Sequence, residues 1–345
     1  RYGLGTALLG LGQAEKAESI FNQLIEEDDS RSQFRFMRGR CRLELGKTTT
    51  ALQDLKVSHA ASPNTLSLKA LANTYWMMRD ETAIDGLINA ALEDPLLATT
   101  AAEVLRQSGA PERSLAAINA ASAKFSLPAE SWAVAASADI DLNEDPNAEM
   151  LAREAIKSLQ SDPLANRNLI VSLLMQGKAD EAMPLIEERR REKPNDQQWI
   201  AYEASALRLL GSERYSQLVD LDRFVRPFTL PIPEGFDSIE SFNAAFLESL
   251  KFLHSDQTHP LNQSLRDGSQ TPRDLTTVDD PVIQAFYKAL DEPIRQYMSD
   301  VGNANDHPLT KRNTGEYRIA GGWSVKLHGS GRHVNHVHPE GWISS

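Results

Sequence analysis

Small and bulky apolar residues recur with a fixed period along the first two-thirds of the chain. Gly5, Gly12, Ala17 and Phe21 each have a counterpart 34 residues later. The counterparts are Gly39, Gly46, Ala51 and Leu55. Small residues let two antiparallel helices approach closely, the second glycine turns the chain, and the bulky residue fills the gap to the next helix pair. The pattern therefore predicts a series of helical hairpins.

The same frame returns further along the chain. Gly177, Ala182 and Ile186 repeat it, and Gly211 follows Gly177 by 34 residues. This period and its pattern resemble the tetratricopeptide repeat family. The resemblance covers residues 1–222 and implies about six hairpins in an α-solenoid, with a protein or peptide bound on the concave face of the repeats.

The 34-residue rhythm stops at a proline-rich stretch. Residues 223–237 read as a linker. Beyond them, the pattern over 238–254 predicts an amphipathic helix with a serine as its N-cap. A second helix is predicted over 280–301, capped by Asp280 and kinked at Pro293.

Near the end of the chain the periodicity changes to two. "WSVKLH" and "RHVNHVH" predict two strands, joined by a hairpin turn at "GSG". His336 and His338 then project from one side of the second strand, where two imidazoles can bind one metal ion. Ordinary half-exposed strand histidines are the alternative. The overall prediction is a mainly α fold in which an α-solenoid precedes an incomplete α+β domain.

Three stretches resemble a second family. "FNAAFLESLKFLH", "HPLNQSLRDGSQT" and "WSVKLHGSGRHVNHVHPEGWISS" together look like the 2-oxoglutarate/Fe(II)-dependent oxygenases that are fused behind tetratricopeptide repeats in bacteria. This resemblance covers about residues 225–345. It implies that residues 238–345 are the leading part of an oxygenase domain and begin a double-stranded β-helix, or jelly-roll. It also implies Fe(II) as cofactor and 2-oxoglutarate as cosubstrate.

The resemblance assigns His336 as the first iron ligand and His338 as the second. Most such enzymes have a carboxylate as the second ligand, and Glu340 is the alternative here. We favour His338, because Pro339 and Gly341 indicate that the strand ends before Glu340.

Other parts of the oxygenase site are expected beyond Ser345. They are the distal histidine and the base that binds the cosubstrate, so this fragment is expected to be inactive alone. Arg266 and Gln270 are predicted on a loop that covers the active site or reaches the substrate. A purely structural loop is the alternative reading for both. Because Arg1 falls inside the first predicted helix, an upstream segment is expected as well.

Composition narrows the function classes. The net charge of −12 argues against a nucleic-acid partner, because phosphate binding needs a basic surface. The single cysteine is typical of a reducing compartment, and no apolar run approaches the roughly 20 residues that span a bilayer, so a cytoplasmic protein is expected. The leading hypothesis is a hydroxylase acting on a protein that the repeats deliver. The alternatives are a non-catalytic protein-binding scaffold and a cupin-like metalloenzyme that does not use 2-oxoglutarate.

Overall fold

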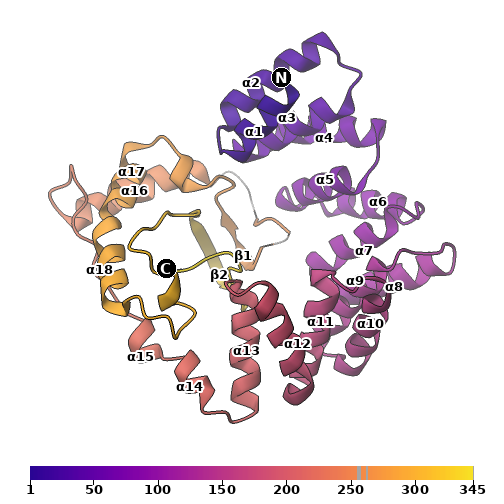
Figure 1. The fold of residues 1–345 in the computed structure, drawn as a ribbon. Helices are drawn as coiled ribbons and strands as arrows, with labels where there is room; N and C mark the ends of the chain where they lie inside the picture. Colours follow the sequence, from indigo (N-terminus) through magenta and orange to yellow (C-terminus); the bar gives the residue numbers. More distant parts are fainter. Residues whose placement is uncertain (255–257, 262, 345) are drawn as a thin grey trace. The chain divides into compact units, whose positions relative to one another are not determined.

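The computed structural model describes residues 1–254, 258–261 and 263–344. It is mainly helical, and the helices follow one another in pairs (Figure 1). The chain forms two compact units, and each contains segments from before and after the proline-rich stretch. Unit 1 comprises Arg1–Leu127, Gly235–Ala285 and Gly321–Val334, and unit 2 comprises Pro128–Glu234, Phe286–Ala320 and Asn335–Ser345. The division predicted at residues 223–237 stays a prediction.

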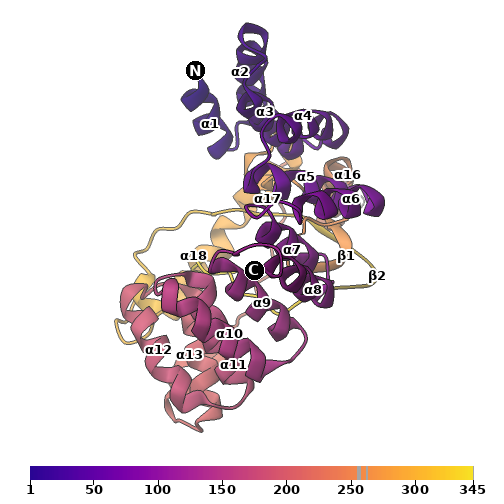
Figure 2. The same ribbon diagram turned by 90° about the vertical axis from the view of Figure 1, so that its right-hand side faces the viewer.

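Consecutive helices of the repeat region pack as antiparallel hairpins. Figure 2 shows α3 beside α4 and α5 beside α6 in unit 1. The helices of unit 1 up to residue 127 are α1 (Tyr2–Gly10), α2 (Ala14–Glu27), α3 (Ser32–Glu44), α4 (Thr48–Ala61), α5 (Thr65–Met77), α6 (Glu81–Ala91), α7 (Ala98–Gln107) and α8 (Pro111–Ser122). Unit 2 begins with α9 (Glu130–Asp141), α10 (Asp145–Ser158), α11 (Pro163–Met175), α12 (Ala179–Glu192), α13 (Gln197–Leu209), α14 (Arg214–Leu218) and α15 (Leu221–Phe224).

A left-handed residue turns the chain in every hairpin from α1/α2 to α13/α14. The φ angles of these residues are positive, from 59° at Arg79 to 85° at Gly109. The full set is Gly12, Gly46, Arg79, Gly109, Asn143, Gly177 and Gly211. Glycine adopts this conformation without steric cost, which explains its recurrence at the turn. The turn glycines expected from the period are therefore observed, whereas Arg79 and Asn143 fill the same position without being glycines.

Close packing explains the glycines inside α1 and α3, the first helices of the first two hairpins. A Cβ atom on Gly39 of α3 would lie 2.9 Å from Cγ of Leu55, and one on Gly5 of α1 would lie 2.8 Å from the ring of Phe21. Leu55 and Phe21 are fully buried. The bulky residue of each hairpin therefore packs on the small residue of the same hairpin, a contact that was not predicted from the sequence.

The described strands form one two-stranded antiparallel sheet in unit 1. β1 (Leu265–Gln270) pairs with β2 (Val325–His333). The predicted hairpin at "GSG" is wrong, because these residues lie within β2 and the partner strand comes from about sixty residues earlier. The GSG residues form a bulge in β2 opposite Asp267 of β1. The Asp267 carboxylate accepts a hydrogen bond from Ser330 at 2.8 Å. A jelly-roll is not confirmed by a sheet of this size.

The predicted helices beyond the linker are present. α16 (Ile239–Leu253) is capped by Ser238, whose hydroxyl accepts from the main-chain N–H of Ser241. Asp280 caps the next helix by accepting from the main-chain N–H of Val282. The single helix predicted over 280–301 is instead two helices that are separated at Leu290, and Pro293 lies in the first turn of the second one. The remaining elements are η1 (Leu275–Thr277), α17 (Pro281–Ala289), α18 (Asp291–Val301) and η2 (Thr310–Arg312).

Candidate protein-binding surface

The two predicted metal ligands lie close together but outside any strand. β2 ends at His333, and the described residues 334–344 are irregular. The ring centroids of His336 and His338 are 5.1 Å apart, and their planes are inclined at 69°. Both side chains and that of Glu340 are exposed. The strand predicted through residue 338 is therefore wrong.

The described residues do not complete an iron site. An oxygenase of the predicted family holds iron with two histidines and one carboxylate. In residues 1–254, 258–261 and 263–344, no three His, Cys, Asp or Glu side chains converge in a group that could hold a metal ion. The assignment of His336, His338 and the alternative Glu340 stays a prediction from the sequence, as do Fe(II) and 2-oxoglutarate.

Main-chain hydrogen bonds hold the segment that follows these histidines within unit 2. The N–H of Gln197, at the first position of α13, donates to the carbonyl of Pro339 at 2.9 Å. The carbonyl of Gly341 accepts from the Gln197 side chain at 3.2 Å and from Arg312 at 2.7 Å. The sequence contains no short motif that signals these contacts, because their partners are far apart along the chain.

Arg266 and Gln270 lie in strand β1, so the predicted loop is wrong. The guanidinium of Arg266 donates to the carbonyls of Gln263 and Leu265, both at 2.7 Å. Gln270 is paired with Val325 in the sheet. These contacts give both residues a place in the sheet, and their predicted part in an active site stays untested.

A histidine earlier in the chain makes structural contacts. His254, at the C-terminus of α16, forms hydrogen bonds with Ser269 at 2.9 Å and Ser324 at 3.0 Å. Ser269 lies in β1 and Ser324 directly precedes β2, so this imidazole ties the helix to the sheet. Burial, and then the positive charge of Lys326, lower the pKa of His254.

One face of α5 has the features of a polypeptide-binding surface. Leu66, Lys69, Asn73 and Trp76 are spaced three or four residues apart, so they share one face of the helix. We call this the α5 face. The buried apolar residues of α5 are Leu68, Leu71, Ala72, Tyr75 and Met77.

A segment from the second part of unit 1 packs on the α5 face. The main-chain N–H of Leu261 donates to Oδ1 of Asn73 at 2.8 Å. The imidazole of His259 meets the Trp76 ring edge to face, with centroids 6.0 Å apart. His259 and Leu261 are each only 4% exposed. The α5 face therefore contacts both a main-chain amide and an imidazole ring of this segment.

The Asn73 amide is oriented for this role. Its Nδ2 donates to the sulfur of Met77 at 3.3 Å, which leaves Oδ1 as the acceptor for Leu261. The pKa of His259 is lowered by burial and further by the positive charge of Arg266. The neutral imidazole therefore suits the apolar contact with Trp76.

A second contact lies at the turn of the first hairpin. Arg273 donates to the carboxylate of Glu15 at 2.8 Å and to the carbonyl of Thr277 at 3.1 Å. Thr277 packs closely on the turn, because a Cβ atom on Gly12 would lie 2.7 Å from its Cγ2. Residues 258–261 and 273–277 thus contact two different hairpins of unit 1.

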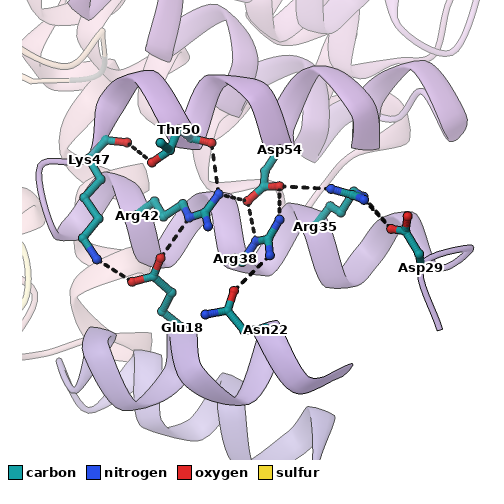
Figure 3. A network of polar contacts seen from close by, with 9 residues as sticks. All are labelled: Glu18, Asn22, Asp29, Arg35, Arg38, Arg42, Lys47, Thr50 and Asp54. Atoms are coloured by element: carbon teal, nitrogen blue, oxygen red, sulfur yellow. Dashed lines mark hydrogen bonds and ion pairs between the residues drawn. The ribbon is translucent and has the colours of Figure 1, made fainter. Parts of the chain in front are cut away.

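A polar network joins the first hairpin to the second (Figure 3). Asp54 of α4 is 2% exposed and accepts two hydrogen bonds of 2.7 Å from Arg38 and one of 2.8 Å from Arg42. Arg42 also donates to Glu18 of α2 at 2.9 Å, and Arg38 donates to Asn22 at 2.9 Å. This network was not predicted from the sequence. The sequence signal that could have revealed it is the spacing of Arg35, Arg38 and Arg42, which places the three arginines on one side of α3.

Comparison with known protein families supports the tetratricopeptide assignment for the first part of the chain. Residues 2–64, which contain α1 to α4, match the family model described as tetratricopeptide repeat. No protein in the curated collection matches the chain. The family match does not reach residues 238–345, so the oxygenase resemblance has the sequence motifs as its only support.

Several solved structures are similar to the chain. A tetratricopeptide repeat protein from Parabacteroides merdae ATCC 43184 is 15% identical, with a TM-score of 0.40 and coverage of 60% of this chain and 80% of its own. A thermophilic tetratricopeptide protein of Thermus thermophilus is 22% identical, with a TM-score of 0.35 and coverage of 59% and 95%. The RpL4 assembly chaperone Acl4 is 15% identical, with a TM-score of 0.39 and coverage of 62% and 97%.

Proposed function

We propose that this chain is a protein-interaction scaffold and that the α5 face binds a segment of a partner polypeptide. The observation that carries the proposal is the hydrogen bond from the Leu261 main chain to Asn73, made beside the contact between His259 and Trp76. Every polypeptide offers a main-chain amide, whereas few offer a ring at the correct distance. The α5 face therefore combines a general contact with a selective one.

The position of the α5 face in its hairpin supports this proposal. In unit 1, the first helix of one hairpin contacts the first helix of another: α1 contacts α3, and α5 contacts α7. Each of these helices also packs on the second helix of its own hairpin. Stacked hairpins of this kind present a continuous surface to partners. Within the described part of the chain, no helix combines the length and the apolar character needed to cross a lipid bilayer.

A selection experiment tests the proposal. Random peptides displayed on phage are selected against the immobilised full chain, and a selected peptide is then titrated calorimetrically. In a chain whose α5 face is freed by His259→Ala and Leu261→Asp, we expect Asn73→Ala to weaken binding about fivefold, which corresponds to about 1 kcal/mol for one hydrogen bond. Asn119→Ala, the same change at an exposed position of α8, serves as the matched control and leaves the Kd unchanged. In that same background, equal affinity of every selected peptide with and without Asn73→Ala or Trp76→Ala would contradict the proposal.

The oxygenase remains a second candidate, supported by the motifs at the end of the chain and by the 5.1 Å separation of the His336 and His338 rings. Two neighbouring imidazoles offer a metal ion two nitrogen ligands on one side. Among the described residues, these two imidazoles are not part of a group of three His, Cys, Asp or Glu side chains that could hold a metal ion. The scaffold is the better supported function, because the hairpins that carry it are present throughout the repeat region.

A further inference from the structure

We propose that Thr258–Leu261 occupies the α5 face in cis in the way a partner peptide does, and that the partner presents the same chemistry. That chemistry is a flat ring, followed two residues later by an aliphatic residue whose main-chain N–H reaches Asn73. The inference rests on the proposed function, because it names the kind of partner that the same surface accepts and the segment that this partner displaces.

Thr258–Leu261 contacts the α5 face in the way that a bound peptide would. Thr258–Leu261 has no regular secondary structure, so its main-chain groups are not used up by a helix or a strand. Its one hydrogen bond to α5 goes to a side chain, Asn73, and its ring contact goes to Trp76. The Leu261 side chain is itself buried. A backbone contact, a ring and a buried aliphatic residue together make a short linear motif.

Proline at position 260 strengthens this interpretation. Proline fixes its own φ angle and restricts the residue before it, so the His-Pro-Leu order limits the conformations of the segment before it binds. A peptide limited in this way loses less conformational entropy when it is immobilised. We therefore expect a partner with proline between its ring and its aliphatic residue to bind more tightly than one with alanine there.

Occupation in cis has a measurable consequence. A surface that its own chain covers is available to a partner only for the fraction of time that the segment is released. The apparent affinity for a partner in trans is reduced by that fraction. Weakening the segment must therefore strengthen binding in trans. Weakening the α5 face must reduce binding in trans once the segment is released, whereas in wild type it weakens the segment and the partner together and changes the apparent affinity little.

The test uses the full chain and a labelled 20-residue peptide with the sequence of residues 258–277, followed by fluorescence anisotropy. A segment variant, His259→Ala with Leu261→Asp, is expected to bind this peptide about tenfold more tightly than wild type. Adding Asn73→Ala to the segment variant reverses most of the gain. Asn73→Asp, which keeps an acceptor oxygen, retains it. A scrambled peptide is the control for sequence.

Several outcomes overturn the inference. One is a segment variant with the helical circular dichroism of wild type whose affinity for the peptide is the same as that of wild type. Another is a wild-type dimer that dissociates in the segment variant, since the occupant would then be a second copy. If the segment variant fails to fold, Leu261→Ala replaces it. A gain of less than about threefold with that variant contradicts the inference equally.

The results separate this inference from the proposed function. If library peptides bind the α5 face but the 258–277 peptide neither binds nor competes with them, the scaffold proposal stands and the occupation in cis is wrong. If the 258–277 peptide binds the segment variant but no library peptide is selected, the segment is an internal structural contact and the external partner is wrong.

Discussion

The Arg38 guanidinium of α3 binds both carboxylate oxygens of Asp54 on α4, with each hydrogen bond 2.7 Å long. Asp54 is almost completely buried, and Arg42 donates to it as well (Figure 3). Paired in this way, the charges are tolerated inside the hairpin. Without Asp54, Arg38 would remain partly buried without its carboxylate partner, whereas Arg42 would keep Glu18.

We therefore expect Asp54→Ala to lower the free energy of unfolding by about 3–5 kcal/mol, because it breaks a buried ion pair and leaves the other partner in place. Urea unfolding followed by circular dichroism measures the change. Asp29→Ala is the matched control, because the Asp29 side chain is 63% exposed and should matter by no more than about 1 kcal/mol. Similar losses for the two variants would show that the network is not a main support of the hairpins.

A glycine of α3 and a glycine of α6 should respond oppositely to alanine. A Cβ atom at Gly39 would lie 2.9 Å from the buried Leu55, so Gly39→Ala should destabilise the chain by about 1–3 kcal/mol. At Gly86 nothing lies within 4 Å, and Gly86→Ala should stabilise α6 by up to about 1 kcal/mol. Thermal unfolding measures both, and shifts of Tm in the same direction would contradict the packing described for α3 and α4.

Acidification should weaken unit 1. Burial is the main cause of the lowered pKa values at His59, His254 and His259, each of which starts from an ordinary value of 6.5. The unfolded chain therefore binds protons at a higher pH than the folded chain does. Stability is full above about pH 6.5 and declines as the pH falls below it.

Thermal unfolding at about pH 7.5 and about pH 5.5 checks this direction, with a lower Tm expected at the lower pH. Replacing the three histidines by glutamine should flatten the dependence, because glutamine does not titrate. An unchanged or higher Tm for the acidified wild type would mean that these imidazoles do not stay neutral in the folded state.

The iron prediction needs its own measurement. In an anaerobic Fe(II) titration, we expect wild type to bind metal and the double variant His336→Ala, His338→Ala to lose most of the binding. The variant His328→Ala, His333→Ala removes two other histidines near the end of the chain and should bind as wild type does. If all three proteins behave alike, the two imidazoles do not hold iron.

The repeat region could be predicted because its signals are local. Gly12 and Gly46 mark turns at a fixed spacing, and each has a packing glycine seven residues earlier. The turn at Arg79 could not be predicted in this way, because an arginine with a φ of 59° carries no sequence signal for a left-handed residue. The main-chain N–H of Arg79 donates to the carbonyl of Trp76 at 2.9 Å, the same bond that Gly12 and Gly46 make in their turns.

The sheet could not be predicted, because its pairing is not local. "GSG" resembles a hairpin turn, yet Gly331 serves a close approach between strands. A Cβ atom at Gly331 would lie 2.3 Å from the carbonyl oxygen of Asp267. β1 was hidden by its Gly, Ser and Asp residues, which are poor strand formers. The α5 face was missed for the same reason, since Asn73 and Leu261 are separated by 188 residues.

The most direct test of the scaffold function is to locate a bound peptide. A peptide from the display selection, carrying a photoreactive residue, is cross-linked to the full chain, and the attachment sites are identified by mass spectrometry. We predict cross-links on α5 at and around Lys69, Asn73 and Trp76, and their loss when the 258–277 peptide is added in excess. Cross-links confined to α6, to α8 or to unit 2 would contradict the account.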